Sequence, residues 1–308
     1  MDLVLITNCS ARKKTAPVLR VSALRPACAS DLARAWQRLV DKAAHQLTVR
    51  ELYRGPSASA GRAAAEESGA SWYLTSAGMG LVHSSRRIPS YDLTIARSGQ
   101  NSSVLRKIRS GQRDSAQEWW KALTEVRGAP YPIRRLIKRR KDALIVLAVS
   151  TPYLQMIDRD LIGLSQDDVK RIRIITANKN VVPNQLRTAV MPYDARLNSR
   201  DSPVRGPMVS FVQRAAWHFL RIVAAYRGSS SALVDADRVR RALATLRPPI
   251  AKRRRRVSDR RLIKLATKMR SEGIASAHMG LRVLRKRFRI ACAQSRFARI
   301  WQRALEAK

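Results

Sequence analysis

The stretch LVLITNCSARKK, residues 3–14, decides the fold of this chain. Its first half is a short apolar run, typical of a buried strand, and it opens directly into polar and cationic residues. Open α/β sheets place their ligand sites at the carboxyl ends of parallel strands. We therefore expect residues 2–8 to form a strand whose end, from Asn8 onward, borders a ligand-binding crevice.

Three further apolar segments predict strands of the same sheet: 71–77, 143–149 and 171–177. Residues 47–53 also have a strand-like pattern, and helical patterns lie between these segments. Strands that alternate with helices are typical of an α/β fold. We expect a mostly parallel central sheet with helices on both faces.

The charge of the chain is as informative as its pattern. It has 61 Lys and Arg against 22 Asp and Glu, a formal net charge of +39. Such an excess destabilises a compact state by self-repulsion unless an anionic partner offsets it. A membrane surface is the competing polyanion, but no separate basic amphipathic helix or lipidation signal is present. Nucleic acid is therefore the expected partner, with no membrane and no obligatory protein partner; double-stranded DNA is the form implied by the resemblance described below.

The proline pair at 248–249 and the cations after it interrupt the folded pattern. They predict an α/β domain over residues 1–245, a basic linker over 246–257 and a third region over 258–308. This last region contains three helix-sized pieces, and a glycine turn at Gly273 is typical of a helix-turn-helix. We expect a small all-α nucleic-acid-binding domain.

Cations are concentrated in two places. From Arg247 onward the chain has 20 Lys and Arg against three acidic residues, a net charge of +17. Arginines on a second helix are suited to phosphates and guanine edges in a major groove. The residues predicted to contact DNA there are Arg282, Arg285, Lys286, Arg287 and Arg289. The second basic stretch, 134–141, adds Lys138, Arg139 and Arg140.

Several classes of protein are disfavoured. The longest apolar run, 143–149, is far shorter than the roughly 18 residues of a membrane span, and no basic leader precedes the first strand, so a cytoplasmic protein is expected. Three cysteines without paired spacing and four scattered histidines indicate neither a disulfide framework nor a metal site. We expect no metal and no cofactor.

Carboxylates near the predicted sheet edge are the candidates for chemistry. Hydrolysis of an N-glycosidic bond passes through an oxocarbenium-like transition state, which a nearby carboxylate stabilises while it orients or deprotonates water. Asp92, delivered by the glycine-containing loop 76–92, is the first choice for this role, and Asp194 in MPYDAR is the second. Asn8, with both a donor and an acceptor, completes the catalytic set by reading a base edge or holding water.

The remaining site residues have supporting roles. Ser10, Arg12 and Lys13 are expected to bind a phosphate beside an extruded nucleotide. Tyr53 or Tyr91 is expected to stack on the flipped base, because an enzyme acting on a duplex base must first remove it from the stack. Two more residues of these loops complete the predicted substrate contacts: Ser76 and Arg196. A purely structural role is the alternative for these residues, such as capping a turn for Asp92 or a core position for Tyr53.

The ordered segments ITNCSARKK, ELYRG, WYLTSAGMGLV, IPSYD and MPYDAR carry a resemblance to a known group. They resemble an uncharacterised-domain family related to the sheet domains of peroxide-stress DNA-binding proteins and to uracil-DNA-glycosylase-like folds. Within it, bacterial anti-phage DNA glycosylases that remove glucosylated hydroxymethylcytosine from phage DNA look most similar. The likeness covers about residues 2–220 in scattered motifs. The signature loops of uracil glycosylases are not present in their usual form, so no catalytic role is carried over.

This resemblance implies a DNA glycosylase that flips a modified cytosine and leaves an abasic site. Two alternatives stay open. A base-exchanging transglycosylase on RNA or DNA would share the base flipping and the carboxylate, and a non-enzymatic DNA-binding regulator would need neither. A lyase is disfavoured, because a Schiff-base lysine needs a lowered pKa in an apolar pocket, whereas Lys13 is surrounded by cations in the sequence.

Overall fold

The computed structural model describes residues 2–96, 101–109, 115–249 and 254–306. Contacts divide the chain into two compact units, Met1–Pro249 and Ile250–Lys308. This boundary falls within the predicted linker 246–257, of which residues 250–253 lie outside the described residues. Each unit has its own hydrophobic core.

The larger unit is built on a five-stranded sheet in the order β5-β4-β1-β8-β9. Four strands run parallel: β1 (Asp2–Asn8), β4 (Ser71–Ser76), β8 (Ala143–Ala148) and β9 (Ile172–Ile175). These are the four strands expected from the apolar runs, and the mostly parallel α/β sheet is confirmed. Their side chains are largely buried because helices cover both faces, which is why the sequence reads as continuous apolar runs.

Two details of the predicted sheet are wrong. The fifth strand, β5 (Gly80–His83), pairs antiparallel with β4, whereas the sequence predicted a loop over these residues. Residues 47–53 do not form one strand, because β3 (Leu47–Thr48) leads at once into α2 (Val49–Leu52). The cause is local: the Glu51 carboxylate accepts hydrogen bonds from the Thr48 backbone N–H, at 2.9 Å, and from its hydroxyl, at 2.7 Å.

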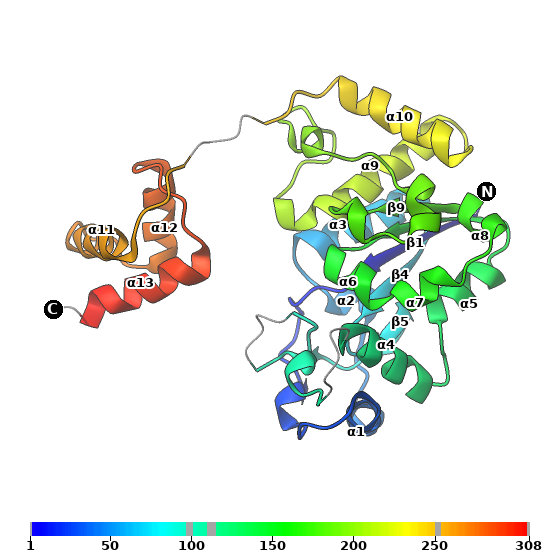
Figure 1. Cartoon of the computed structure of the whole chain (residues 1–308), viewed down its shortest axis with the longest axis horizontal. Helices are drawn as coiled ribbons and strands as arrows, with labels where there is room; N and C mark the ends of the chain where they lie inside the picture. Colours follow the sequence, from blue (N-terminus) through cyan, green and yellow to red (C-terminus); the bar gives the residue numbers. More distant parts are fainter. Residues whose placement is uncertain (1, 97–100, 110–114, 250–253, 307–308) are drawn as a thin grey trace. The chain divides into compact units, whose positions relative to one another are not determined.

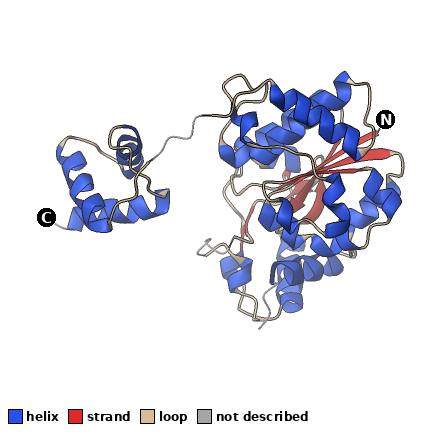
Figure 2. Cartoon of the chain, turned by 45° about the horizontal axis from the view of Figure 1, so that its top comes forward, coloured by secondary structure: helices blue, strands red, loops and turns tan. Residues whose placement is uncertain are grey.

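Helices form a layer on each face of the sheet (Figures 1 and 2). One layer consists of α3 (Pro56–Ser68), α9 (Phe211–Ala225) and α10 (Ala232–Ala244). The other contains α4 (Ser115–Val126), α5 (Pro132–Arg139), α6 (Thr151–Met156) and α7 (Asp158–Ile162), with α1 (Ala29–Lys42) packed on α4. Helix α8 (Gln166–Lys170) precedes β9.

Short elements complete the larger unit. Strand β2 (Leu19–Arg20) pairs with β7 (Tyr91–Asp92), and β3 pairs with β6 (Arg87–Ile88). The 3₁₀ helices are Val21–Ala23, Val104–Arg106, Lys179–Val181, Asn184–Ala189, Ala195–Asn198 and Met208–Ser210. The β2–β7 pair matters for function, because it holds the loop after β1 beside the segment that carries Asp92.

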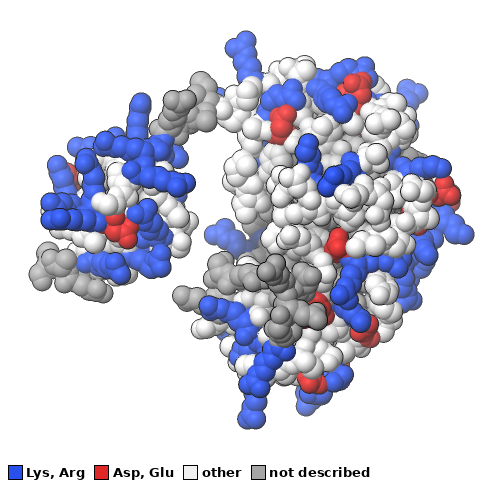
Figure 3. Space-filling model, in the orientation of Figure 1, with Lys and Arg blue, Asp and Glu red and all other residues white. Residues whose placement is uncertain are grey.

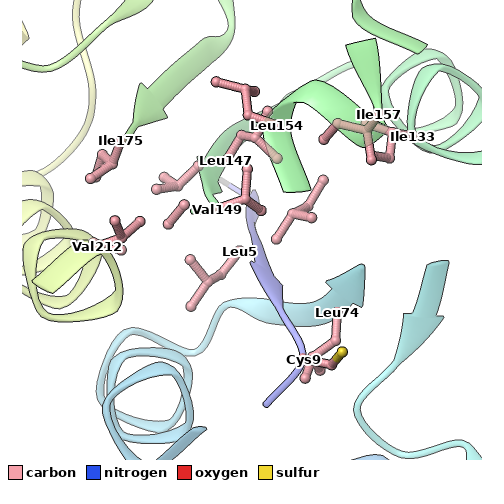
Figure 4. Packing of buried hydrophobic residues seen from close by; sticks show 14 of the residues in the cluster. Leu5, Cys9, Leu74, Ile133, Leu147, Val149, Leu154, Ile157, Ile175 and Val212 are labelled. Carbon is pink, nitrogen blue, oxygen red and sulfur yellow. The ribbon is translucent and has the colours of Figure 1, made fainter. Parts of the chain in front are cut away.

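The core of the larger unit lies on both sides of the sheet. Leu5, Leu147 and Ile175 come from three neighbouring strands, and Val212 of α9 and Leu154 of α6 join the cluster from the two helical layers (Figure 4). All five side chains are buried. This packing fixes the strand ends, and with them the loops at the carboxyl edge.

The smaller unit consists of α11 (Asp259–Ser271), α12 (Ala277–Lys286) and α13 (Gln294–Glu306). Its buried cluster includes Leu262, Leu284 and Phe297. Helices α12 and α13 pack closely, because a Cβ at Gly280 would lie 2.4 Å from the Trp301 ring. The three expected helices are therefore present, and their use as a DNA-reading helix-turn-helix stays a prediction.

Candidate functional site at the carboxyl edge of the sheet

The ends of β1 and β8 form a topological switch point. The chain leaves β1 toward β4 on one side and leaves β8 toward β9 on the other. Open α/β sheets place their ligand crevice at such a reversal, so the ends of β1 and β8 mark the candidate crevice. Asn8 lies at this point, and its side-chain oxygen accepts hydrogen bonds from the Ser150 backbone N–H (2.9 Å) and the Gln213 amide (3.2 Å).

Asn8 is therefore a positioning residue. Its side-chain nitrogen donates to the Cys9 carbonyl oxygen at 3.0 Å, so most of its hydrogen-bonding capacity is used within the protein. The expectation that Asn8 reads a base edge requires this network to open. As it stands, the amide ties the loop after β1 to the loop after β8 and to α9.

Hydroxyls and a thiol gather beside this crevice in what we call the tyrosine cluster: Cys9, Tyr53, Ser76, Tyr91 and Tyr153. The Tyr91 hydroxyl lies 2.5 Å from the Tyr53 hydroxyl and 2.5 Å from the Ser76 hydroxyl. The Cys9 thiol lies 3.1 Å from the Tyr153 hydroxyl and 3.9 Å from that of Tyr91. Burial raises the pKa of all three tyrosines, which keeps them protonated.

The cluster corrects one sequence-based expectation. Tyr53 and Tyr91 are 0% and 1% exposed, so neither ring is free to stack on an extruded base. Two tryptophans fix the turn beside them: Trp36 donates to the Gly78 carbonyl and Trp119 to the Ala77 carbonyl, both at 2.7 Å. The expected close backbone approach at Gly78 is present, because a Cβ there would lie 2.8 Å from the Tyr91 ring.

Lys13 lies over the outer side of the cluster. Its ammonium nitrogen is 4.2 Å from the centre of the Tyr91 ring and 5.6 Å from that of Tyr53. Burial lowers the pKa of Lys13, and the charges of Cys9 and Asp92 partly oppose this effect. The cationic surroundings expected from the sequence are therefore replaced by aromatic rings, a thiol and a carboxylate.

Asp92 follows Tyr91 in the short strand β7, which places it near Lys13 and the tyrosine cluster. Its carboxylate accepts a hydrogen bond from the Ser102 hydroxyl at 2.6 Å, and the residue is half-buried. Among the described residues, no ion pair with a nitrogen within 4.0 Å includes Asp92. Its charge is instead close enough to raise the pKa of Lys13. The fold thus brings the carboxylate of Asp92 and the ammonium group of Lys13 to the same part of the sheet edge.

Asp194 is placed differently. The Arg196 guanidinium makes three contacts with its carboxylate, of 2.8, 3.0 and 3.1 Å. The Asp194 side chain also accepts the Arg196 backbone N–H as the cap of a 3₁₀ helix. Arg196 lowers the pKa of Asp194. This carboxylate and its arginine satisfy each other, so neither has the open chemistry expected of a catalytic or substrate-binding group.

The loop after β1 uses its other predicted residues for support. The Ser10 hydroxyl donates to the carbonyl oxygens of Arg12 (3.0 Å) and Arg54 (2.7 Å). The Arg12 carbonyl in turn accepts the Arg54 backbone N–H at 2.9 Å, which joins the loop to the turn that follows Tyr53. The Arg12 side chain is exposed and is the member of the expected phosphate-binding set that reaches solvent.

The basic segment 134–141 does not border this site. Lys138, Arg139 and Arg140 end α5 and precede β8, so they lie at the amino edge of the sheet, where Arg140 pairs with Asp2 at 3.2 Å. Six residues of β8 separate that edge from the crevice, about 20 Å at about 3.3 Å per residue. Cations in the last turn are also favourable to α5 itself, because they oppose the helix dipole.

In the smaller unit, the predicted DNA contacts divide into two groups. Arg282, Lys286 and Arg289 are exposed. Arg287 is also exposed but pairs with Glu272 at 3.3 Å, whereas Arg285 is half-buried and donates to the Cys292 carbonyl at 2.8 Å. Lys and Arg side chains cover much of the face of the unit drawn in Figure 3.

Sequence reasoning missed two members of the cluster. Cys9 is not among the residues predicted above, although its place directly after a buried strand signals a sheet-edge position. Nothing local marks Tyr153, which comes to Cys9 from 144 residues away through the pairing of β1 with β8. It also missed the polar cavity beyond β9, described below.

The described residues lack two other kinds of feature. No group of three or more His, Cys, Asp or Glu side chains among them is arranged to hold a metal ion. Nor does any helix in the described part of the chain have the length and apolar character that crossing a membrane requires.

Comparison with known proteins gives one match. Residues 39–157 match a protein family of unknown function, DUF6884. No curated protein and no solved structure matches the chain. The matched region is less than half of the chain and includes Tyr53, Ser76, Tyr91, Asp92 and Tyr153, whereas the loop after β1 and the smaller unit lie outside it.

Proposed function

We propose that this protein is a cytoplasmic DNA N-glycosylase that extrudes a modified cytosine, hydrolyses its N-glycosidic bond and leaves an abasic site in phage DNA. The observation that carries the proposal is the placement of Asp92 beside Lys13 at the carboxyl edge of the sheet. A glucosylated hydroxymethylcytosine is the proposed base, on the resemblance given above. The role in defence rests on the same resemblance.

The proposed chemistry needs one carboxylate and one cation. As the bond between the sugar C1′ and the base nitrogen breaks, the electron pair leaves with the base and positive charge develops on the sugar. The Asp92 carboxylate stabilises that charge and orients a water molecule, whose oxygen bonds to C1′ while its proton passes through the carboxylate to the departing base, which leaves neutral. Lys13 and Arg12 hold the flanking phosphate in this scheme.

The smaller unit supplies duplex binding in this proposal. Its exposed cations, Arg282, Lys286 and Arg289, are suited to phosphates and groove edges. Contacts of this kind release counterions, so binding should weaken steeply as salt increases. The net charge of +39 favours the same partner.

The direct test compares DNA containing glucosylated hydroxymethylcytosine with unmodified DNA. After incubation with the full chain, abasic sites are detected as alkali-labile strand breaks. We expect breaks only in modified DNA, and their loss in Asp92→Asn. Asp194→Asn is the matched control, because Arg196 already occupies that carboxylate, and it should retain activity.

The outcomes also separate the alternatives. Uptake of a labelled free base into the polymer would select a base-exchanging transglycosylase. A non-enzymatic regulator predicts that Asp92→Asn leaves phage resistance intact while charge reversal at 282–289 abolishes it. If no modified DNA acquires alkali-labile sites, base excision is refuted.

A further inference from the structure

A cavity of about 750 Å³ lies beyond the carboxyl end of β9, away from the tyrosine cluster. One wall is the segment that follows β9. The other is the segment 187–193, which runs beside the strand, with the Met191 backbone N–H donating to the Ile174 carbonyl at 2.9 Å. A space of this size is in the range of small-molecule sites and exceeds what a single ion requires.

The cavity wall includes an unsatisfied buried hydroxyl. Thr176, the first residue after β9, is 7% exposed, and its side-chain oxygen has no hydrogen-bond partner among the described residues. An unpaired buried hydroxyl costs free energy that a ligand oxygen can recover. Thr176 is therefore a residue of the cavity lining whose hydroxyl has an unused hydrogen bond.

Two cations line the same cavity as Thr176. The side chains of Lys179 and Arg187 are exposed, and within the described residues neither makes a hydrogen bond or ion pair. A nearby carboxylate, Asp194, is already bound by Arg196. In the part of the chain that the structure describes, these two cations are therefore not paired with a carboxylate.

The rest of the lining is suited to an organic group. Val190 and Pro192 give an apolar surface, and the side-chain amide of Asn180 adds hydrogen-bonding capacity. Tyr193 is fixed at the wall by a 2.9 Å hydrogen bond between its hydroxyl and Nδ1 of His218 on α9. Cations, a hydroxyl and an amide thus surround an apolar surface.

We propose that this cavity binds a nucleoside phosphate, with the phosphate at Thr176, Lys179 and Arg187 and the nucleoside against Val190 and Pro192. The site is distinct from Asp92 and Lys13, because β9 lies two strands from β1 in the sheet. It does not depend on base excision. The ligand is either a free mononucleotide or a nucleotide of a bound strand, which share this chemistry.

The first experiment measures binding of deoxycytidine monophosphate to the full chain by calorimetry. Salt of about 0.3 M weakens contacts to scattered exposed cations. We expect one molecule bound per chain, with inorganic phosphate and deoxycytidine each binding more weakly. Thr176→Val and Arg187→Met should each weaken binding by about 10-fold, the loss expected for one hydrogen bond or charge contact.

A matched control and a folding readout make the test specific. Arg38→Met removes an exposed cation from α1 and should bind like the parent. Thr176→Val should leave the urea midpoint unchanged or higher, since it removes an unsatisfied hydroxyl, so weakened binding cannot reflect misfolding. Equal affinity in all variants, or no binding, overturns the proposal.

A final competition distinguishes the two sources of the ligand. If a single-stranded oligonucleotide displaces the mononucleotide from the parent, and about 10-fold more of it is needed in Arg187→Met, the ligand is part of a strand. If the oligonucleotide and the mononucleotide bind together, the ligand is a free nucleotide. Either result supports the site, because both require that the mononucleotide occupies it.

Discussion

Acidification should weaken the larger unit through one buried imidazole. His218 lies on α9, is 6% exposed, and bonds to the Tyr193 hydroxyl at 2.9 Å. Burial, followed by the charge of Arg221, lowers the pKa of His218 from 6.5 to about 4. Above pH 6.5 both the folded and unfolded states hold it neutral. As pH falls from 6.5 to about 4, the unfolded state takes up a proton that the folded state excludes, and stability is lost.

The magnitude follows from that lowered pKa. Full protonation of the unfolded state would cost about 3 kcal/mol at about 1.4 kcal/mol per pH unit, and most of this should appear between pH 7.5 and 4.5. Asp160 acts in the opposite sense, because burial raises its pKa from 3.8 to about 6 and its contribution to stability grows as pH falls through that range. The effect of His218 is therefore isolated by comparing variants.

The assay is urea unfolding followed by tryptophan fluorescence, since five of the six tryptophans belong to the larger unit. His218→Gln keeps a hydrogen-bonding side chain but cannot titrate. Between pH 7.5 and 4.5 the parent should lose about 2 kcal/mol more than this variant. His45→Gln, which removes an exposed imidazole, is the control and should behave as the parent does. Equal losses in the parent and in His218→Gln would refute the reasoning.

Three further outcomes are expected. Arg173→Ala should lower the free energy of unfolding by about 3–5 kcal/mol in urea titrations, because Asp235, 2.7 Å away and fully buried, would lose its main cation; an effect below about 1 kcal/mol, the size typical of an exposed pair, would contradict this. Gly78→Ala should cost about 1–3 kcal/mol and change near-ultraviolet circular dichroism, since its Cβ would overlap the Tyr91 ring; an unperturbed spectrum would contradict the packing. Arg282→Ala should reduce the slope of log Kd against log salt for duplex DNA by about 1, and an unchanged slope would remove Arg282 from the phosphate contacts.

The architecture was predictable from the sequence because strands buried on both faces leave continuous apolar runs. The runs at residues 2–8 and 143–149 are of this kind, and both lie at the centre of the sheet. The edge strand β5 has no such run, and its leading glycines suggest only a turn. At residues 47–53 the sequence contained a helix signal, the capping pair of Thr48 and Glu51. The strand-like residue types around this pair led to the wrong prediction of a strand.

The candidate site was predictable only as a location. The predicted ends of the strands indicate which loops lie together at the carboxyl edge of the sheet. Lys13, Tyr53 and Asp92 could therefore be grouped from the sequence. Side-chain direction and burial depend on tertiary packing. For that reason the enclosure of the two tyrosines and the capture of Asp194 by Arg196 were not visible beforehand.

The Asp92 carboxylate lacks an ion pair within the described part of the chain, although the chain is strongly cationic. With 61 cations and 22 acids, a carboxylate readily meets a guanidinium, as Asp194 and Asp235 do. Asp92 is held instead by the neutral Ser102 hydroxyl, and among the described residues it makes no ion pair. Its negative charge is thus not cancelled by a direct contact with Lys13, which lies over the Tyr91 ring. A substrate that develops positive charge between the two groups would meet a carboxylate still able to stabilise it, whereas Asp194 would first have to release Arg196.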